Sequence, residues 1–252
     1  MVYVFRRASS TGARELAEAL DGVRARNARQ MGRVMPKDTV VYWGDFLATP
    51  VTARKLNAST VLNKLSELRR LADRGVATVL SSTDASVGRG EGWVGRTADH
   101  TGGLDLLHPP AQPDYFVRRE NFVKEVRVHS FMGRSIRAGV KQVREGFQLA
   151  QRGMNEGATQ RGFAHPWVRS WDGGWRIAYS GQGIKQKHRD LAHQAVKAMG
   201  LDFGAVDIGE RADGSLVVLE VNRAPGLEGG TVDAYARAIM SLNTTPPAVV
   251  QA

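Results

Sequence analysis

The sequence has no cysteine, so it contains neither a disulfide framework nor a thiolate nucleophile. No apolar run approaches the roughly 18 residues needed to cross a bilayer. The first ten residues, MVYVFRRASS, lack the apolar core of a signal peptide. A G-x-S-x-G motif, zinc-finger and RNA-recognition signatures and internal repeats are also absent. These absences predict a cytoplasmic protein that has no membrane partner and uses no side-chain nucleophile.

Acidic residues are fewer than basic residues in this sequence. There are 25 of them against 35 lysines and arginines, which gives a net charge of +10 and a pI near 10.3. A basic protein attracts polyanions such as nucleotides, nucleic acid or acidic peptides. The basic residues are spread along the whole chain, however, and no block resembles a nucleic-acid-binding tail. A solvated basic surface and a functional basic face therefore both stay open.

The first hundred residues show the alternating patterns of an α/β protein. Apolar and β-branched runs predict strands, and apolar residues at helical spacing predict helices. The expected elements are strands 2–5, 39–44, 76–81 and 92–96, and helices 11–26 and 58–75. The spacing places Val23 on the first helix and puts Val61, Leu65 and Leu71 on one face of the second, with Gly75 as its C-terminal cap.

From about residue 111 the pattern changes to an antiparallel α+β layout. Consecutive strand patterns, glycine turns and two more amphipathic helices follow. The expected elements are a strand within 113–121, a hairpin over 124–144 turning at Met132 and Gly133, a helix at 188–200, a hairpin over 203–222 and a helix at 233–242. The predicted fold class is α+β with an α/β front part.

The last hairpin carries an acid and an amide on one face of an apolar strand, SLVVLEVN. Asp213 and Gly214 favour a two-residue turn. With that turn, Asp207 lies directly opposite Glu220, and Asn222 shares their face because side chains alternate along a strand.

Two carboxylates opposite each other repel and destabilise a sheet. They become favourable around a hard cation such as Mg²⁺, which prefers oxygen ligands. Two carboxylates and an amide oxygen, with room for phosphate oxygens, are typical of a magnesium–nucleotide site. The alternatives are that one acid is paired with an arginine or that the hairpin has another register.

Asp207, Glu220 and Asn222 stand in the frame D-(x)12-E-x-N-x-x-P-G, which closely resembles the metal-binding signature of ATP-grasp enzymes. GLDFGAVDI and LEVNRAPGLEG most resemble the ribosomal-protein glutamate ligase branch and short ATP-grasp proteins of bacteriophages. The resemblance implies an ATP-grasp fold that holds ATP between two α+β lobes, with Mg²⁺ or Mn²⁺ on those three residues, in a bacterial or phage-infected cytosol.

The same resemblance divides the chain into parts. Residues 1–50 would form a short N-terminal α/β region, 51–110 the central lobe, 111–245 the C-terminal lobe with the metal site, and 246–252 a tail. The division is expected to place the nucleotide between the second and third parts.

The resemblance also implies nucleotide contacts. Lys64 occupies the place of a family lysine, although a solvated helix face explains it equally well. Arg96 stands where a second lysine is usual, and as a permanent cation it can bind phosphate bidentately. Gly102 and Gly103 would bring backbone N–H groups to the phosphates. The adenine would contact the backbone of the hinge residues Tyr115, Phe116 and Val117.

Beyond the hinge, KEVRVHSF offers Glu125 for the ribose or a phosphate and Arg127 for the transferred phosphoryl group. A cross-strand ion pair is the alternative for both. The returning strand should add a cation that faces the phosphates, with Lys141 preferred over Arg144. Arg127 and Lys141 are the predicted catalytic residues.

ATP-grasp enzymes phosphorylate a carboxylate and let an amine attack the acyl-phosphate. The predicted function is therefore a Mg²⁺- and ATP-dependent carboxylate–amine ligase, with a peptide or protein among the candidate substrates. The alternatives are a kinase-like phosphotransferase on the same fold and a catalytically weak nucleotide- or nucleic-acid-binding module. The sequence does not identify the acid, the amine or the oligomeric state.

Overall fold

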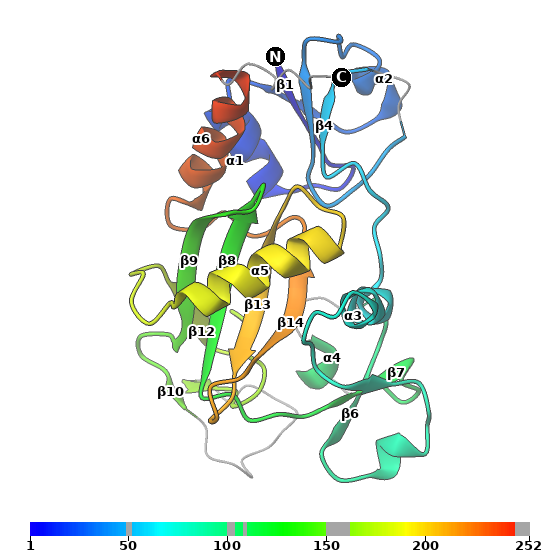
Figure 1. The fold of residues 1–252 in the computed structure, drawn as a ribbon, viewed down its shortest axis with the longest axis vertical. Helices are drawn as coiled ribbons and strands as arrows, with labels where there is room; N and C mark the ends of the chain where they lie inside the picture. Colours follow the sequence, from blue (N-terminus) through cyan, green and yellow to red (C-terminus); the bar gives the residue numbers. More distant parts are fainter. Residues whose placement is uncertain (49–51, 100–103, 108–109, 150–161, 245–252) are drawn as a thin grey trace.

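The computed structural model describes residues 1–48, 52–99, 104–107, 110–149 and 162–244. These residues form three principal sheets and the helices that cover them (Figure 1). None of the helices in these ranges has the length and apolar character needed to span a membrane.

The N-terminal sheet is parallel throughout, as the α/β pattern predicted. Its strands, in spatial order, are β2 (Val23–Ala25), β1 (Val2–Phe5), β3 (Thr39–Tyr42) and β4 (Arg54–Leu56). The short helix α2 (Ala28–Met31) follows β2, and α1 (Thr11–Ala19) begins at the N-cap Ser10, whose side chain accepts from the Ala13 N–H.

The prediction that the first helix continues to residue 26 is wrong. The helix ends at Ala19, because Asp21 adopts a left-handed backbone with φ 46° and the chain then turns back into β2. Val23 pairs with Tyr3 of β1 instead of lying on a helical face. Pairing of β2 with β1 thus prevails over the helical pattern, which predicts the structure correctly only for residues 11–19.

The last helix, α6 (Thr231–Thr244), returns to the N-terminal sheet and packs against α1 (Figure 1). One hydrophobic core joins both ends of the described chain, with Val4 and Leu16 from the front and Tyr235 and Ile239 from α6 all fully buried. Phe203 at the start of the large sheet belongs to this same core.

The second sheet is small and antiparallel, in the order β5 (Ser81–Ser82), β7 (Tyr115–Arg118) and β6 (Trp93–Arg96). It is accompanied by α3 (Lys64–Asp73), the 3-10 turn η1 (Val87–Arg89) and α4 (Leu104–Leu107). The predicted strand 76–81 is mostly irregular, since its one pairing before Ser81 is an isolated bridge from Thr78 to Val218.

The prediction that the second helix begins near residue 58 is also wrong. Helix α3 starts at Lys64, because the Asn63 side chain caps it by accepting from the Ser66 N–H. Val61 precedes the helix and is 47% exposed, whereas Leu71 is fully buried. Gly75 follows the C-terminal cap with φ 71°, as predicted.

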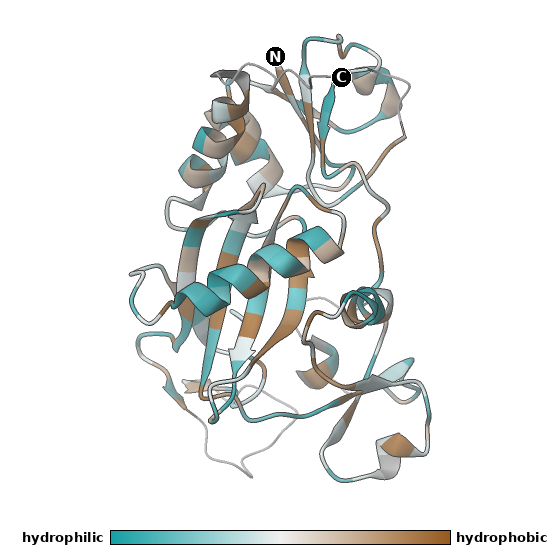
Figure 2. Cartoon of the chain, in the orientation of Figure 1, coloured by the Kyte–Doolittle hydropathy of each residue, from teal (hydrophilic) through white to brown (hydrophobic). Residues whose placement is uncertain are grey.

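The third sheet has five antiparallel strands. Their order is β12 (Trp175–Ala178), β9 (Arg134–Val143), β8 (Lys124–Phe131), β13 (Phe203–Glu210) and β14 (Leu216–Asn222). Helix α5 (Gln186–Ala198) crosses one face of this sheet and shows mainly hydrophilic residues on its outer side (Figure 2). A two-stranded pair, β10 (Gln148–Leu149) and β11 (Phe163–Ala164), lies beside it.

The β13–β14 hairpin brings Asp207 opposite Glu220, as predicted, but by a different route. The turn has three residues, since the Arg211 N–H donates to the Ser215 carbonyl and Gly214 has φ 81°. That turn alone would shift the register by one residue. A β-bulge at Leu219, between the Ile208–Val218 and Asp207–Glu220 pairs, restores it.

Candidate active site

A cavity of about 700 Å³ lies at the junction of α3, the small sheet and the open face of the five-stranded sheet. One part of its lining is apolar, with Leu68, Val79, Val94, Val117 and Leu219. Another part carries charged side chains from four strands of the large sheet and from α3. The volume falls within the range of small-molecule sites, and the division suits a ligand with an apolar and an anionic end.

Asp207 is the centre of the charged part. The Arg127 guanidinium donates to its two carboxylate oxygens over 2.6 and 2.9 Å, and Lys141 Nζ lies 2.9 Å from Oδ2. All three side chains are at least four-fifths buried. Burial alone would raise the pKa of Asp207, but the Arg127 and Lys141 charges hold it below the ordinary range. Asp207 is therefore an anion at neutral pH.

Lys141 links Asp207 to a second buried acid, Glu125, over 3.2 Å. Arg169 faces the other oxygen of Glu125 over 3.4 Å and donates to the Phe122 carbonyl over 3.0 Å. The prediction did not include Arg169. It lies on a loop outside the described strands, and no pattern in the sequence distinguishes it from other arginines.

Glu220 is held from the opposite wall of the cavity. Lys64 Nζ, at the start of α3, lies 2.7 Å from Glu220 and 3.8 Å from Glu67. Lys64 thus faces the acid predicted to hold the metal and is not on a solvated face. Glu67, also missed by the prediction, accepts from the Val221 N–H over 2.6 Å, and burial raises its pKa to about 7 despite the nearby Lys64 charge.

The expected repulsion between Asp207 and Glu220 is offset by these cations. Each acid has its own basic partners, so the anticipated alternative of an arginine-paired acid is realised at Asp207. The Asn222 side-chain oxygen accepts from the Ala224 N–H over 2.9 Å at the end of β14. In the described ranges, no three histidines or acids gather as a metal cluster.

The donor chemistry nevertheless fits a hard divalent cation. Asp207, which is buried, and Glu220, which is partly exposed, are in register on adjacent strands at the cavity wall. Desolvation acts to raise both pKa values, but neighbouring cations hold them below the ordinary range. Their present partners are basic groups that phosphate oxygens would attract equally well. A magnesium–nucleotide complex could therefore replace these ion pairs, with Mg²⁺ bound by the acids and the phosphates bound by the basic groups, and no buried charge would be left unpaired. The metal assignment stays a prediction.

Arg96 lines the cavity, but its guanidinium is already engaged. It forms a two-point pair with Asp105 of α4, with Nε to Oδ2 at 2.6 Å and Nη2 to Oδ1 at 3.0 Å. This pair fastens α4 to β6. The predicted phosphate contact from Arg96 would require the guanidinium to be shared with Asp105. Gly102 and Gly103 lie outside the described residues.

The three residues predicted to contact the adenine, Tyr115 to Val117, lie on β7. Tyr115 and Val117 line the cavity, and burial raises the pKa of Tyr115 to about 12. The Phe116 side chain packs instead against Gly88 of η1. β7 is the middle strand of its sheet, with neighbours on both sides. The segment after it, Glu120 to Phe122, also borders the cavity.

Arg144, the second choice for the returning strand, and His129 of β8 lie away from the charged cluster. Arg144 stacks on the Phe147 and Trp171 rings, so Lys141 is the cation of β9 that faces the cavity. His129 is fully buried between the Tyr235 and Tyr179 hydroxyls. Burial and the Arg127 charge lower its pKa to about 3, so it is a neutral packed histidine.

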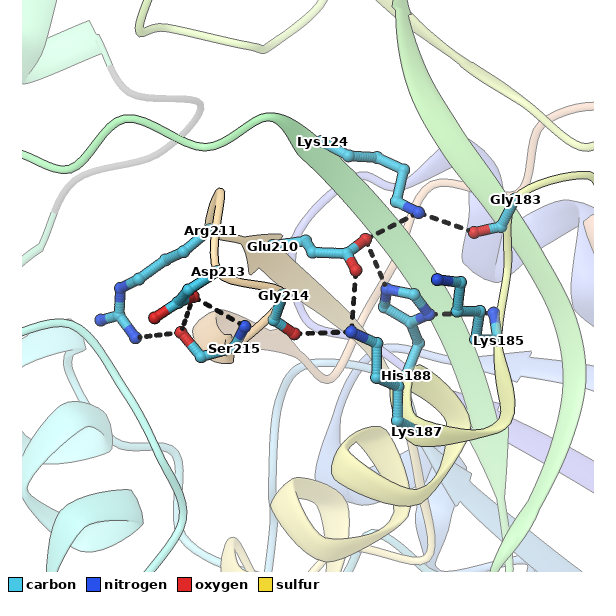
Figure 3. A network of polar contacts seen from close by, with 10 residues as sticks. All are labelled: Lys124, Gly183, Lys185, Lys187, His188, Glu210, Arg211, Asp213, Gly214 and Ser215. Carbon is cyan, nitrogen blue, oxygen red and sulfur yellow. Dashed lines mark hydrogen bonds and ion pairs between the residues drawn. The ribbon is translucent and has the colours of Figure 1, made fainter.

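A separate network fixes the far end of the strand that carries Asp207 (Figure 3). Glu210, at the end of β13, accepts from Lys124 of β8 over 2.7 Å and from Lys187 of α5 over 2.8 Å. The His188 imidazole lies 3.3 Å away and receives the Lys185 N–H on its other nitrogen. Two strands and a helix are thus fastened together, which restricts movement of Asp207 relative to Arg127.

Comparisons with known proteins agree with the fold described above. Residues 178–240 match the family described as RimK-like ATP-grasp domain. No curated protein sequence matches the chain.

Three solved structures share the fold. The ATP-grasp ligase PsnB complexed with minimal precursor is 14% identical, with a TM-score of 0.60 over 97% of this chain and 99% of that chain. The macrocyclase MdnC bound with precursor peptide MdnA, from Microcystis aeruginosa MRC, is 11% identical, with a TM-score of 0.58 over 97% and 100%. D-alanine–D-alanine ligase from Bacillus anthracis is 13% identical, with a TM-score of 0.62 over 97% and 96%.

The chain has the ATP-grasp fold, with a parallel N-terminal sheet followed by antiparallel sheets. The match of residues 178–240 to the RimK-like ATP-grasp domain agrees with the predicted resemblance. The predicted fold is therefore confirmed. At these identities the likeness concerns the fold, and the activity is argued from the residues.

Proposed function

We propose that the chain is an ATP- and Mg²⁺-dependent carboxylate–amine ligase that forms an acyl-phosphate intermediate. The observation that carries this proposal is the cavity itself. An apolar part suited to a nucleobase adjoins an array in which Arg127, Lys141 and Lys64 alternate with Asp207 and Glu220. Phosphoryl transfer depends mainly on positioning and on neutralising charge, and this array offers both.

In the first step, an oxygen of the substrate carboxylate attacks the γ-phosphorus of ATP. The bond from that phosphorus to the β–γ bridging oxygen breaks, and ADP leaves. In the second step, the amine nitrogen attacks the acyl carbon, inorganic phosphate departs with the carbon–oxygen electron pair, and the amine releases a proton. Neither step needs a side-chain nucleophile, which agrees with a chain that lacks cysteine.

Each charged residue has a role in this scheme. Arg127 and Lys141 would bind the transferred phosphoryl group, and Lys64 and Arg169 would bind the remaining phosphates. Asp207 and Glu220, with Asn222, would hold Mg²⁺, which supplies neutralisation of charge on the phosphate oxygens. Glu125 would orient Lys141 and Arg169 while facing the ribose or a phosphate.

A peptide or protein is the favoured class of substrate. Two of the structures that share the fold are complexes with precursor peptides, PsnB and MdnC. The similarity to these complexes concerns the fold alone, and the net charge of +10 is compatible with an acidic peptide partner.

The test measures ADP release from Mg-ATP in the presence of pools of carboxylic acids, amines and short peptides. A ligase releases ADP at full rate only with an acid and an amine together, and a mass increase then identifies the product. ADP release with a single substrate and no condensation would indicate a kinase instead. Nucleotide binding without turnover in any pool would indicate a binding module.

A further inference from the structure

The carboxyl end of the N-terminal sheet carries a group of arginines. Strand β1 continues directly into Arg6 and Arg7, while β2 contains Arg24 and is followed by Arg26. The two strands are parallel neighbours, with Val4 opposite Arg24, so these side chains meet at one edge. In open sheets with parallel strands, ligands bind outside the carboxyl ends of the strands.

Most of this positive charge is uncompensated. Of the described residues, none with a carboxylate forms an ion pair with three of the arginines: Arg7, Arg24 and Arg26. We name these three the arginine patch. Asp45, a nearby acid, lies 3.6 Å from Arg6 Nε and accepts from the backbone N–H of Arg7 over 2.9 Å, but it forms no ion pair with the Arg7 side chain.

Arg24 shows how crowded the positive charge is. Its guanidinium donates to the Ala8 carbonyl over 2.8 Å, in the loop before α1. Burial and the charges of Arg26, Arg14 and Arg6 all lower the pKa of Arg24. Several positive charges thus gather around one loop, and a bound anion would reduce the repulsion among them.

The patch adjoins the turn that follows the proposed metal strand. Gly44, after β3, has φ 85°, and a Cβ there would overlap Arg6 Nη1 and lie 2.7 Å from the Ala224 Cβ. Ala224 is two residues beyond Asn222, and its backbone N–H donates to the Asn222 side-chain oxygen. Arg6, which directly precedes Arg7 of the patch, therefore packs with the turn after β14 around Gly44.

The patch is built for carboxylates more than for nucleic acid. Single-stranded nucleic acid is usually held by exposed aromatic rings on which bases stack. The aromatic residues of these strands and the residue after β3 are all at most 7% exposed: Tyr3, Phe5, Tyr42 and Trp43. Arginine, by contrast, matches a carboxylate with two parallel hydrogen bonds.

We propose that the arginine patch is a docking surface for an acidic segment of a polypeptide. The role of this polypeptide as the ligation substrate rests on the function proposed above, whereas its binding does not. The acidic residues pair with Arg7, Arg24 and Arg26, and this docking holds the neighbouring part of the polypeptide beside the turn after β14.

The test is fluorescence anisotropy with a fluorescein-labelled hexaglutamate peptide, without nucleotide, at physiological ionic strength. The variant is Arg7→Glu with Arg26→Glu, since both side chains are exposed and their loss leaves the fold intact. The matched control is Arg69→Glu with Arg70→Glu on exposed positions of α3, which changes the net charge equally. Arg24→Gln is a third variant with a smaller charge change.

We expect the patch variant to weaken binding on the order of tenfold, because two exposed ion pairs are lost and two repulsions replace them. Arg24→Gln should weaken it less, and the control by under about twofold because its site is remote. Equal weakening in patch variant and control would show that only net charge matters and would overturn the proposal. So would an unlabelled oligothymidylate that binds more tightly than hexaglutamate, which would assign the surface to nucleic acid. Because nucleotide is omitted, an enzyme without ligase activity would leave this result unaffected.

Discussion

Replacing Asp207 by asparagine distinguishes two physical accounts of the site. If Asp207 and Glu220 merely repel each other, removing one charge stabilises the protein without nucleotide. If the pairing with Arg127 and Lys141 dominates, removing the carboxylate leaves two buried cations without a counter-ion. The structure favours the second account, because both cations lie within 3 Å of Asp207.

The magnitude follows from burial. Side-chain exposure is 7% for Asp207, 19% for Arg127 and 11% for Lys141. Removing one partner of such a buried pair costs about 3–5 kcal/mol. Asparagine keeps the shape and one acceptor oxygen, so we expect a cost of about 3 kcal/mol, or a drop in Tm of about 6–12 °C for a chain of this size.

Urea and thermal unfolding without nucleotide measure this effect. Glu220→Gln is the comparison, because its side chain is 36% exposed and, among the described residues, it forms an ion pair only with Lys64. That variant should lose about 1 kcal/mol or less. Both variants should lose ADP formation. An Asp207→Asn protein as stable as the wild type, or more stable, would refute the pairing account.

Two further predictions follow from buried groups. The folded protein keeps His129 neutral, with a pKa of about 3, so the unfolded chain binds an extra proton below about pH 6.5. His129 should therefore lower the free energy of unfolding by about 1.4 kcal/mol for each pH unit from pH 6 down to 4, while Glu67, whose pKa is raised to about 7, contributes with the opposite sign. Urea titrations of His129→Gln beside the wild type should show the His129 contribution as a difference in slope, and parallel profiles would contradict the assignment. Arg96→Ala should raise the KM for ATP more than Asp105→Asn does if Arg96 binds phosphate. Equal, non-additive effects in the double variant would mean that Arg96 only anchors α4.

The sequence was most informative where chemistry and local spacing agree. The facing of Asp207 and Glu220 was predicted correctly, although two irregularities had to cancel: a three-residue turn and a bulge at Leu219. Neither leaves a distinctive local signal beyond Gly214. The start of α3 was predicted wrongly, near residue 58, although Asn63, directly before Lys64, is a favourable N-cap residue that marks it.

The ion-pair partners could not be predicted in the same way. Arg127 meets Asp207 across 80 positions of sequence, and the pairing depends on β8 lying next to β13 in the sheet. Arg169 and Glu67 reach the site through a loop and a helix that approach from different sides of the cavity. Such contacts depend on the tertiary arrangement and produce no periodic pattern in the sequence.

The core shared by α1 and α6 affects the order in which the parts of the chain can fold during synthesis. Val4 and Leu16 emerge early from the ribosome, yet they are covered in part by Tyr235 and Ile239, more than 200 positions later. Contacts so distant in sequence slow folding, because the intervening chain must be ordered first. The N-terminal sheet is synthesised before the other described sheets, yet it is among the last to be covered. Until α6 arrives, its apolar face is a natural target for chaperones.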